Sequence, residues 1–153
     1  MNKQISNFSR RKFVGFGLAS ALAPSVVRGK SPNGKLNMGI IGSGGRGGAN
    51  LNGVKAENIH TLCDINRKTL EAVQKRFKGA KTTTDWREVV SNPDIDAVVI
   101  STADHHHAPA AIAAMRAGKH VYCEKPLAHT VQEARWMQEE YAKAKGKIAT
   151  QMG

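Results

Sequence analysis

From Lys35 to the last residue, the chain alternates short apolar runs with longer segments of helical periodicity. The runs are separated by glycine, asparagine or aspartate, which is typical of strands. The run at residues 96–102 is apolar without alternation, as expected for a strand buried on both faces of a parallel sheet. Six strands are predicted, at residues 36–41, 58–65, 81–84, 96–102, 119–124 and 147–151.

Helical segments lie between these strands. Leu70, Val73 and Phe77 recur at helical spacing, Asp85 is a suitable N-cap, and Gly118 follows an alanine-rich helix that it can close. Helices are predicted at residues 67–77, 85–90, 108–118 and 130–145. Strands joined by helical crossovers indicate an α/β fold with a doubly wound parallel sheet.

A glycine-rich loop follows the first predicted strand. Gly42, Gly44 and Gly47 form the pattern GxGxxG, in which the glycines allow a tight turn, close approach to a pyrophosphate and close helix packing. The helix N-terminus then offers free N–H groups to phosphates. The alternative is a glycine-rich loop without a ligand, and Arg46 is either a partner of a phosphate or simply solvated. The expected cofactor-binding residues of this loop are Gly42, Ser43, Gly44, Gly45, Arg46 and Gly47.

An acidic residue at the end of the second predicted strand strengthens the dinucleotide interpretation. Asp64 follows Gly42 by 22 residues, where a carboxylate accepts hydrogen bonds from the ribose hydroxyls of adenosine. Its charge disfavours a 2′-phosphate, so NAD is the expected cofactor. Arg67 lies nearby and keeps NADP open as the alternative.

Three consecutive histidines follow the fourth predicted strand, in the segment STADHHHAP. Consecutive residues do not face one way on a helix, and no cysteine or acidic pair at ligand spacing accompanies them, so no metal site is expected. The segment lies at the carboxyl ends of the strands, where ligands bind in doubly wound sheets. The alternative is a polar loop in which Asp104 or a histidine caps the next helix.

The segment YCEKPLAHT follows the fifth predicted strand and places Glu124 and Lys125 directly before Pro126. This rigid turn directs one cation toward the same crevice. Such a lysine can hold a substrate hydroxyl or help to move its proton. The alternative is a solvated Lys–Glu pair.

The formal net charge of +11 is unevenly distributed. Six of the 23 basic residues and none of the 12 acidic residues lie in residues 1–30, so the rest of the chain carries only +5. Aromatic residues are few and do not interleave with basic ones. Nucleic acid is therefore not an expected partner.

The first 30 residues resemble a twin-arginine export signal. Arg10 and Arg11 precede FVGFGLASALAPSVV, a mildly apolar stretch that is too short and too polar for a membrane-spanning helix. Export to the periplasm or beyond, with the twin-arginine machinery as partner, is therefore expected. The alternative is a basic amphipathic or disordered arm.

The two cysteines are expected to be free thiols. Cys63 and Cys123 fall on predicted strands that lie three positions apart in the sheet, hence about 14 Å from each other. A disulfide needs Cα atoms within about 7 Å.

Several of these motifs together resemble the N-terminal nucleotide-binding domain of the Gfo/Idh/MocA oxidoreductases, particularly the exported, sugar-related branch. They are MGIIGSGGRGGANL, LCDINR, AVVISTADHHHA, GKHVYCEKPLAHTVQEARWM and ATQMG. The resemblance implies a Rossmann-type domain over residues 35–153. It also implies that Lys125 is catalytic and contacts both substrate and nicotinamide, that Glu124 lies by the nicotinamide ribose, and that Ser101, Thr102 and His107 line the cofactor crevice. Ala103 stands where the family commonly has proline, which is expected to loosen this loop.

The resemblance also implies hydride transfer between NAD and a sugar or polyol. Family members continue into a second α+β domain that supplies substrate contacts, a catalytic histidine and the homo-oligomer interface. Because the sequence stops at Gly153, it is expected to be truncated and to bind nucleotide with little or no turnover. Two alternatives remain open: an NAD-dependent glycoside hydrolase of the same fold, and a nucleotide-binding fragment without catalysis.

Overall fold

The computed structural model describes residues 34–144 and 146–153. The candidate export signal at residues 1–30 and the last predicted residue of the final helix, Lys145, lie outside these residues. The strands are β1 (Asn37–Ile41), β2 (Asn58–Cys63), β3 (Lys81–Thr83), β4 (Ala97–Ile100), β5 (His120–Cys123) and β6 (Thr150–Met152). The helices are α2 (Gly45–Gly53), α3 (Arg67–Gln74), α4 (Trp86–Ser91), α5 (His107–Arg116) and α6 (Val131–Ala144), with a 3₁₀ turn, η1, at Asp104–His106.

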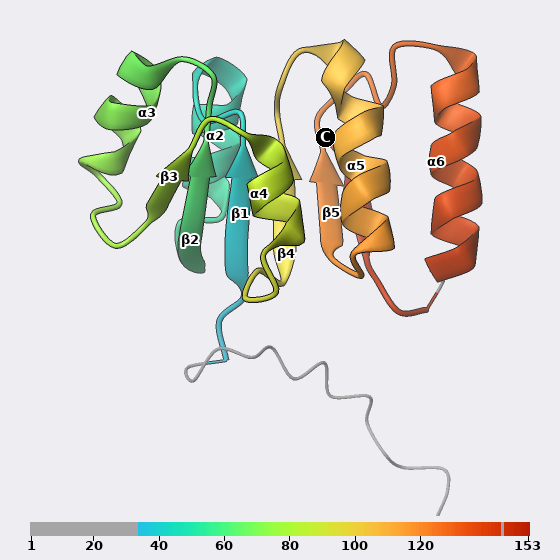
Figure 1. Ribbon diagram of the computed structural model, residues 1–153, viewed down its shortest axis with the longest axis horizontal. Coiled ribbons are helices and arrows are strands. Elements are labelled where there is room, and N and C mark those ends of the chain that lie inside the picture. The colour runs from blue at the N-terminus through green and yellow to red at the C-terminus, as the bar shows by residue number, and fades with distance from the viewer. Residues whose placement is uncertain (1–33, 145) are drawn as a thin grey trace, which may run out of the picture.

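The six strands form one sheet in the order β3-β2-β1-β4-β5-β6, and every neighbouring pair is parallel. The predicted doubly wound α/β fold is therefore confirmed. The strand order reverses between β1 and β4, because β2 lies on one side of β1 and β4 on the other (Figure 1). This reversal is the switch point beside which doubly wound sheets bind their ligands.

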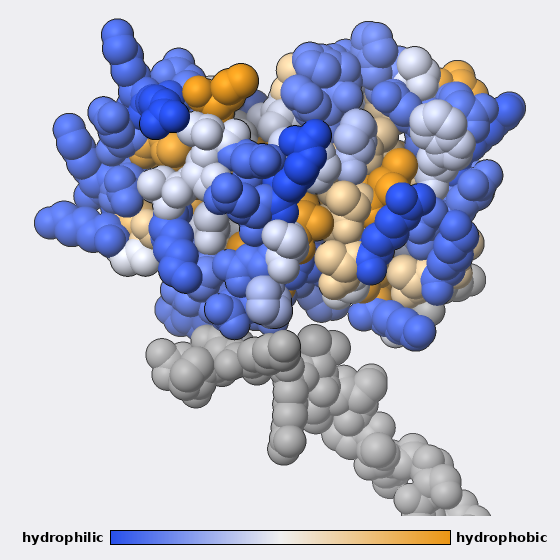
Figure 2. All heavy atoms as spheres, viewed as in Figure 1, coloured by the Kyte–Doolittle hydropathy of each residue, from blue (hydrophilic) through white to orange (hydrophobic). Residues whose placement is uncertain are grey.

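Two hydrophobic clusters cover the two faces of the sheet. One contains the buried residues of α4, α5 and α6, which lie in front of the sheet in Figure 1, and the other contains Leu51 of α2 and Leu70 of α3. Ile40 and Val98, on adjacent central strands, are completely buried. Hydrophilic residues cover most of the face shown in Figure 2.

Several observed boundaries differ from the predicted ones. A side-chain cap follows the early end of β2, and a tighter turn follows the early end of α3. β2 stops at Cys63, after which Asn66 caps α3 by accepting hydrogen bonds from two backbone amides. α3 ends at Gln74, and Phe77 N–H then bonds the Gln74 carbonyl in a tighter turn. The last strand begins at Thr150 rather than residue 147.

Other local predictions are confirmed. The Asp85 side chain accepts a hydrogen bond from Arg87 N–H and so caps α4. Gly118 follows Ala117, the C-cap residue of α5, and has φ +72°, a value that favours glycine. Cys63 on β2 and Cys123 on β5 are buried free thiols, as their separation by three strand positions requires.

Within the part of the chain that the structure describes, no helix combines the length and the apolar character that a membrane crossing needs.

Candidate functional site

The glycine loop and the α2 N-terminus form a cradle that side chains would fill. Gly42 has φ +85°, and a Cβ placed on it would lie 2.6 Å from the Ser101 carbonyl oxygen. A Cβ on Gly47 would overlap the Gly42 carbonyl oxygen, so the helix packs directly on the turn. The N-cap residue of α2 is Gly44, which has no side chain to accept hydrogen bonds from the first backbone N–H groups of the helix. These features fit a pyrophosphate held by backbone N–H groups.

Asp64 lies beside this loop, as predicted, and it also holds the loop in place. Its Oδ2 accepts hydrogen bonds from Ser43 N–H at 2.9 Å, Gly44 N–H at 3.1 Å and the Ser43 hydroxyl at 3.2 Å, whereas Oδ1 accepts from Asn66 N–H at 2.9 Å. Each carboxylate oxygen has about two acceptor positions, so Oδ1 retains one position for a ribose hydroxyl.

A cleft of about 520 Å³ opens at the carboxyl ends of β1, β2 and β4. A cavity of this size suits a nucleotide. Among the predicted residues it is lined by Gly42, Gly44, Asp64, Ser101 and Thr102.

Other residues of this cleft were not predicted. They include Ile65, Trp86, His105 and His106, and Ile65 is 89% exposed although it is apolar. Its position directly after Asp64, at the end of a strand that lines the crevice, was the signal available in the sequence.

Arg67 is not among the residues that line this cleft. It lies at the start of α3 and lines a separate hollow of about 320 Å³ that also touches Thr82 and Thr84 near β3. The structure therefore gives no support to its predicted contact with the cofactor.

Arg46 forms an ion pair that the sequence did not predict. Its Nε donates to Glu124 Oε2 at 3.0 Å, although 64% of the Arg46 side chain is exposed. The pair joins the glycine loop to the loop after β5, across 78 residues of sequence. The sequence offered two alternatives for Arg46, a phosphate partner or a solvated side chain, and neither included its contact with the Glu124 carboxylate.

Asn50 on α2 completes the surroundings of Glu124. Its Nδ2 donates to Glu124 Oε2 and to Ser101 Oγ, both at 2.8 Å. The hydrogen bond from Asn50, and then that from Arg46, lower the pKa of Glu124 to about 2. The carboxylate is 7% exposed, and its other oxygen, Oε1, has no hydrogen-bond partner among the described residues. An unpaired buried acceptor fits a hydroxyl of a bound ligand.

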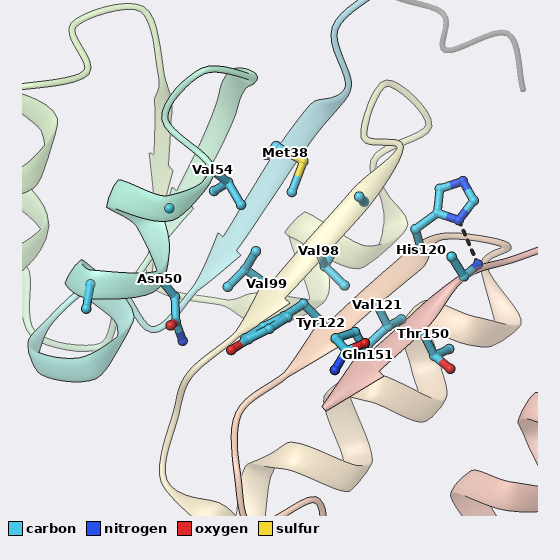
Figure 3. Close-up of a pocket in the computed structure, with 14 residues that line it drawn as sticks. Met38, Asn50, Val54, Val98, Val99, His120, Val121, Tyr122, Thr150 and Gln151 are labelled. Carbon is cyan, nitrogen blue, oxygen red and sulfur yellow. Dashed lines mark hydrogen bonds between the residues drawn. The ribbon is translucent and has the colours of Figure 1, made fainter. Parts of the chain in front are cut away.

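A second hollow, of about 580 Å³, runs along the α2 side of the sheet beside this network (Figure 3). Met38, Val99 and Tyr122 give it an apolar floor, and Asn50 lies at one end near the Tyr122 ring.

Lys125 follows Glu124 but does not pair with it. Glu124 bonds to Arg46 and Asn50, whereas the exposed Lys125 ammonium makes no hydrogen bond or ion pair to any residue that the structure describes. The alternative of a solvated Lys–Glu pair is therefore wrong. The Lys125–Pro126 peptide bond is cis. Lys125 thus remains available to a substrate at the carboxyl end of β5.

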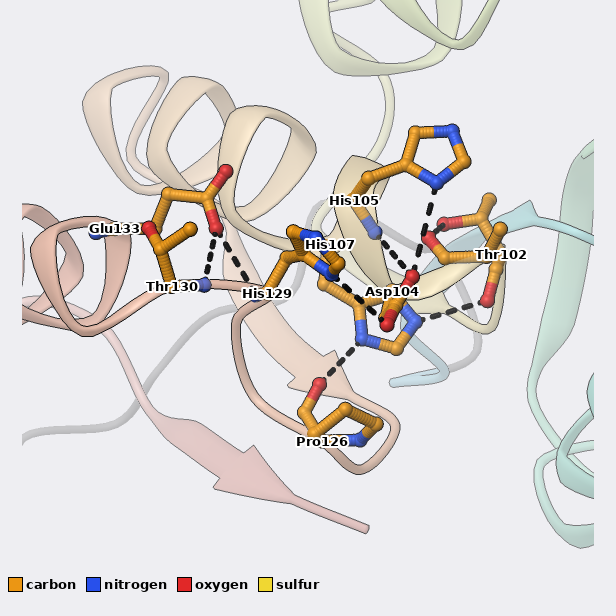
Figure 4. Close-up of polar contacts among 9 residues, drawn as sticks. Thr102, Asp104, His105, His107, Pro126, His129, Thr130 and Glu133 are labelled. Atoms are coloured by element: carbon orange, nitrogen blue, oxygen red, sulfur yellow. Dashed lines mark hydrogen bonds and ion pairs between the residues drawn. The ribbon is translucent and has the colours of Figure 1, made fainter.

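The three consecutive histidines lie in two different surroundings, and Figure 4 shows His105 and His107. His105 and His106 line the cleft, but the His107 ring is 1% exposed and lies between the carbonyl oxygens of Thr102 and Pro126. The expectation that His107 lines the crevice is corrected: as the first residue of α5, its side chain points into the protein. Within residues 34–144 and 146–153, no group of three metal-ligating side chains is placed to hold an ion.

Asp104 does not cap a helix as the alternative proposed. Its carboxylate accepts a hydrogen bond from His105 N–H at 2.8 Å and lies 3.1 Å from His129 Nδ1. The contact with His129, and then the bond from His105, lower the pKa of Asp104. Ala103 has φ −66°, the angle to which a proline is restricted, so the loop adopts at this position the backbone angle that proline would impose.

The sequence model of the oxidoreductase family with an NAD-binding Rossmann fold, GFO_IDH_MocA, matches residues 36–152. The chain belongs to this family. It therefore contains the NAD-binding domain of the Gfo/Idh/MocA oxidoreductases.

Individual relatives agree with this assignment. The chain is 37% identical over 113 residues to levoglucosan dehydrogenase of Pseudarthrobacter phenanthrenivorans, with 67% of this chain and 29% of the relative aligned. It is 35% identical over 134 residues to an α-N-acetylgalactosaminidase of Shewanella oneidensis, with 75% and 29% aligned. The structure resembles myo-inositol dehydrogenase of Lactobacillus casei in complex with NAD(H) and myo-inositol, with a TM-score of 0.71, 27% identity and coverage of 78% and 36%. The chain thus spans about a third of the length of these proteins.

Proposed function

We propose that this Gfo/Idh/MocA chain is the cofactor-binding part of an oxidoreductase that transfers a hydride between a carbon of a sugar or polyol and NAD. The observation that carries the proposal is the position of Lys125. It is exposed and unpaired among the described residues, at the same edge of the sheet as the glycine loop.

In this proposal each residue of the site has a separate task. Backbone N–H groups at the α2 N-terminus bind the pyrophosphate, and Asp64 binds the adenosine ribose. Glu124 accepts a hydrogen bond from the nicotinamide ribose through its unpaired Oε1. Lys125 binds the substrate hydroxyl and holds the carbon that exchanges the hydride. The bound nicotinamide supplies the hydride acceptor.

NAD is proposed in preference to NADP. Asp64 places a negative charge beside the position of the 2′-hydroxyl, and Arg67, which could neutralise a 2′-phosphate, lines a different hollow.

The test is NADH formation by the protein with levoglucosan, inositols and related polyols. Lys125→Met is expected to abolish NADH formation and to leave the affinity for ADP unchanged, because Lys125 acts at the substrate and nicotinamide and not at the glycine loop. NAD binding without turnover of any polyol would instead support a nucleotide-binding role without catalysis.

A glycoside hydrolase that uses NAD transiently is the second candidate. It is favoured by the 35% identity to the α-N-acetylgalactosaminidase, which extends over a longer alignment than that to the levoglucosan dehydrogenase. Release of sugar from a glycoside with no net change in the cofactor would identify this activity.

We also propose that residues 1–30 direct export by the twin-arginine machinery, which would place the protein in the periplasm or outside the cell. The proposal rests on Arg10 and Arg11 before the apolar stretch. Fused to a reporter, residues 1–33 should direct its export, and Arg10→Lys with Arg11→Lys should stop it. Unchanged export in the double variant would contradict the proposal.

A further inference from the structure

Asn50 joins helix α2 to the loops that follow β4 and β5. Its Nδ2 donates to Ser101 Oγ, in the first loop, and to Glu124 Oε2, in the second, both at 2.8 Å. The amide nitrogen carries two hydrogens, so each contact uses one of them. The same helix begins at the glycine loop, where backbone N–H groups are available to a pyrophosphate. Asn50 therefore connects the proposed phosphate site with two loops at the carboxyl ends of β4 and β5.

Of the two partners of the amide, Glu124 depends on it more than Ser101 does. The Glu124 carboxylate is 7% exposed and is ionised at neutral pH, because the hydrogen bonds from Asn50 and then Arg46 lower its pKa to about 2. An ionised carboxylate only accepts hydrogen bonds, and a buried charge that loses a donor is destabilised more than a neutral group. A serine hydroxyl can instead rotate toward another partner. Loss of the amide should therefore displace mainly Glu124.

The donors to Glu124 approach one oxygen of the carboxylate and leave the other unpaired. Arg46 Nε lies 3.0 Å from Oε2, the atom that Asn50 also bonds, whereas Oε1 is buried and has no hydrogen-bond partner among the described residues. Arg46 is exposed, but Asn50 is partly buried at the end of the hollow beside the Tyr122 ring (Figure 3). Asn50 is therefore the donor that is better shielded from water.

We propose that Asn50 is a positioning residue, which holds Glu124 at a fixed place relative to the α2 N-terminus so that Oε1 meets a hydroxyl of the nicotinamide ribose. The role of Glu124 in this inference rests on the proposed function. Both amide hydrogens of Asn50 are bonded to protein atoms. Asn50 therefore acts on the cofactor through Glu124 and not by direct donation.

The first test compares the binding of NAD and ADP to the 153-residue protein and its variants by calorimetry. ADP lacks the nicotinamide ribose, so its affinity does not depend on Glu124, and it reports whether a variant keeps an intact glycine loop. In Asn50→Leu the Kd for NAD is expected to rise about tenfold, the effect of losing roughly one hydrogen bond to a charged group. The Kd for ADP is expected to stay unchanged.

The matched control is Asn52→Leu, the same substitution on the same helix. Asn52 is exposed, and its side-chain oxygen accepts a hydrogen bond from Arg76, away from Glu124. This variant should change neither Kd. Asn50→Ala, which removes the amide without adding apolar volume, takes the place of Asn50→Leu if the latter does not bind ADP.

The second test asks whether Asn50 acts through Glu124. Glu124→Ala should weaken NAD binding and leave ADP binding unchanged. If Asn50 only positions the carboxylate, the double variant Asn50→Leu, Glu124→Ala should bind NAD as weakly as Glu124→Ala alone, because the group that the amide holds is already gone. Losses that multiply in the double variant would show that Asn50 acts independently of Glu124 and would overturn the inference.

Equal weakening of NAD and ADP in Asn50→Leu, or no weakening of either, would also overturn the positioning role. In these cases the unsubstituted protein still binds NAD, so the proposed function stands. If the unsubstituted protein binds ADP but not NAD, the proposed function fails and this inference fails with it. The unsubstituted protein thus distinguishes the two failures.

Discussion

Arg46 Nε lies 3.0 Å from Glu124 Oε2 and connects the glycine loop with the loop that carries Lys125. The register of the sheet produces this contact, because β1 pairs with β4 and β4 with β5, so that their following loops meet at one edge. The pair joins the two parts of the site that would hold the pyrophosphate and the nicotinamide.

The first prediction concerns the pKa of Glu124, which is about 2 because Asn50 and then Arg46 donate to its carboxylate. Asn50→Leu and Arg46→Gln should each raise this pKa, and an NMR titration of the carboxyl carbon measures both. A pKa that stays near 2 in both variants would contradict the network.

The same shift determines a pH effect on stability. The pKa of Glu124 in the folded protein lies below its ordinary value of 4.5, so the ionised Glu124 carboxylate stabilises the fold. This contribution to the free energy of unfolding is complete above pH 4.5 and is lost as the pH falls toward 2. In Asn50→Leu, the loss of stability over this interval should be smaller than in the unsubstituted protein, as measured by urea unfolding at several pH values.

The second prediction concerns two glycines of α2. Gly47→Ala places a Cβ against the Gly42 carbonyl, and overpacking of this kind costs about 1–3 kcal/mol of stability. It should also abolish NAD binding by displacing the turn. Gly53→Ala is the matched control, since a Cβ there meets no atom within 4 Å and the better helix former should stabilise by about 0.5–1 kcal/mol. Equal effects of the two substitutions would refute this explanation of the loop.

The third prediction is that Ala103→Pro stabilises the protein. Ala103 already has φ −66°, so proline would restrict the unfolded chain without straining the native loop. The expected gain is about 0.4–1 kcal/mol in urea unfolding. A lower midpoint would mean that proline does not fit between Thr102 and Asp104.

The fourth prediction concerns the thiols. Burial raises the pKa values of Cys63 and Cys123 to about 12, so neither forms a thiolate at pH 8 in the folded protein. Ellman's reagent should react with both only as fast as the protein unfolds. Rapid reaction of either thiol without denaturant would contradict the observed burial.

Much of the fold could be predicted because its signals are local. Apolar runs and helical periodicity identified every element of the sheet, and the glycine pattern with Asp64 located the cofactor loop. Element ends were less predictable, since they depend on particular hydrogen bonds such as the cap that Asn66 makes to α3.

The contacts within the site could not be predicted because they depend on tertiary geometry. The Arg46–Glu124 pair forms only once β1, β4 and β5 are aligned. The different surroundings of His106 and His107 arise because η1 ends and α5 begins between them. Three identical residues in a row give no sequence signal of that change of direction.

The most direct test of the proposed cofactor site is calorimetric titration of the 153-residue protein and its Asp64→Ala variant with NAD and with NADP. We expect saturable binding of NAD, weaker binding of NADP, and a marked loss of NAD affinity in Asp64→Ala, which lacks both the ribose acceptor and the bonds to Ser43 and Gly44. No binding of NAD by the folded protein, or tighter binding of NADP, would contradict the proposed site.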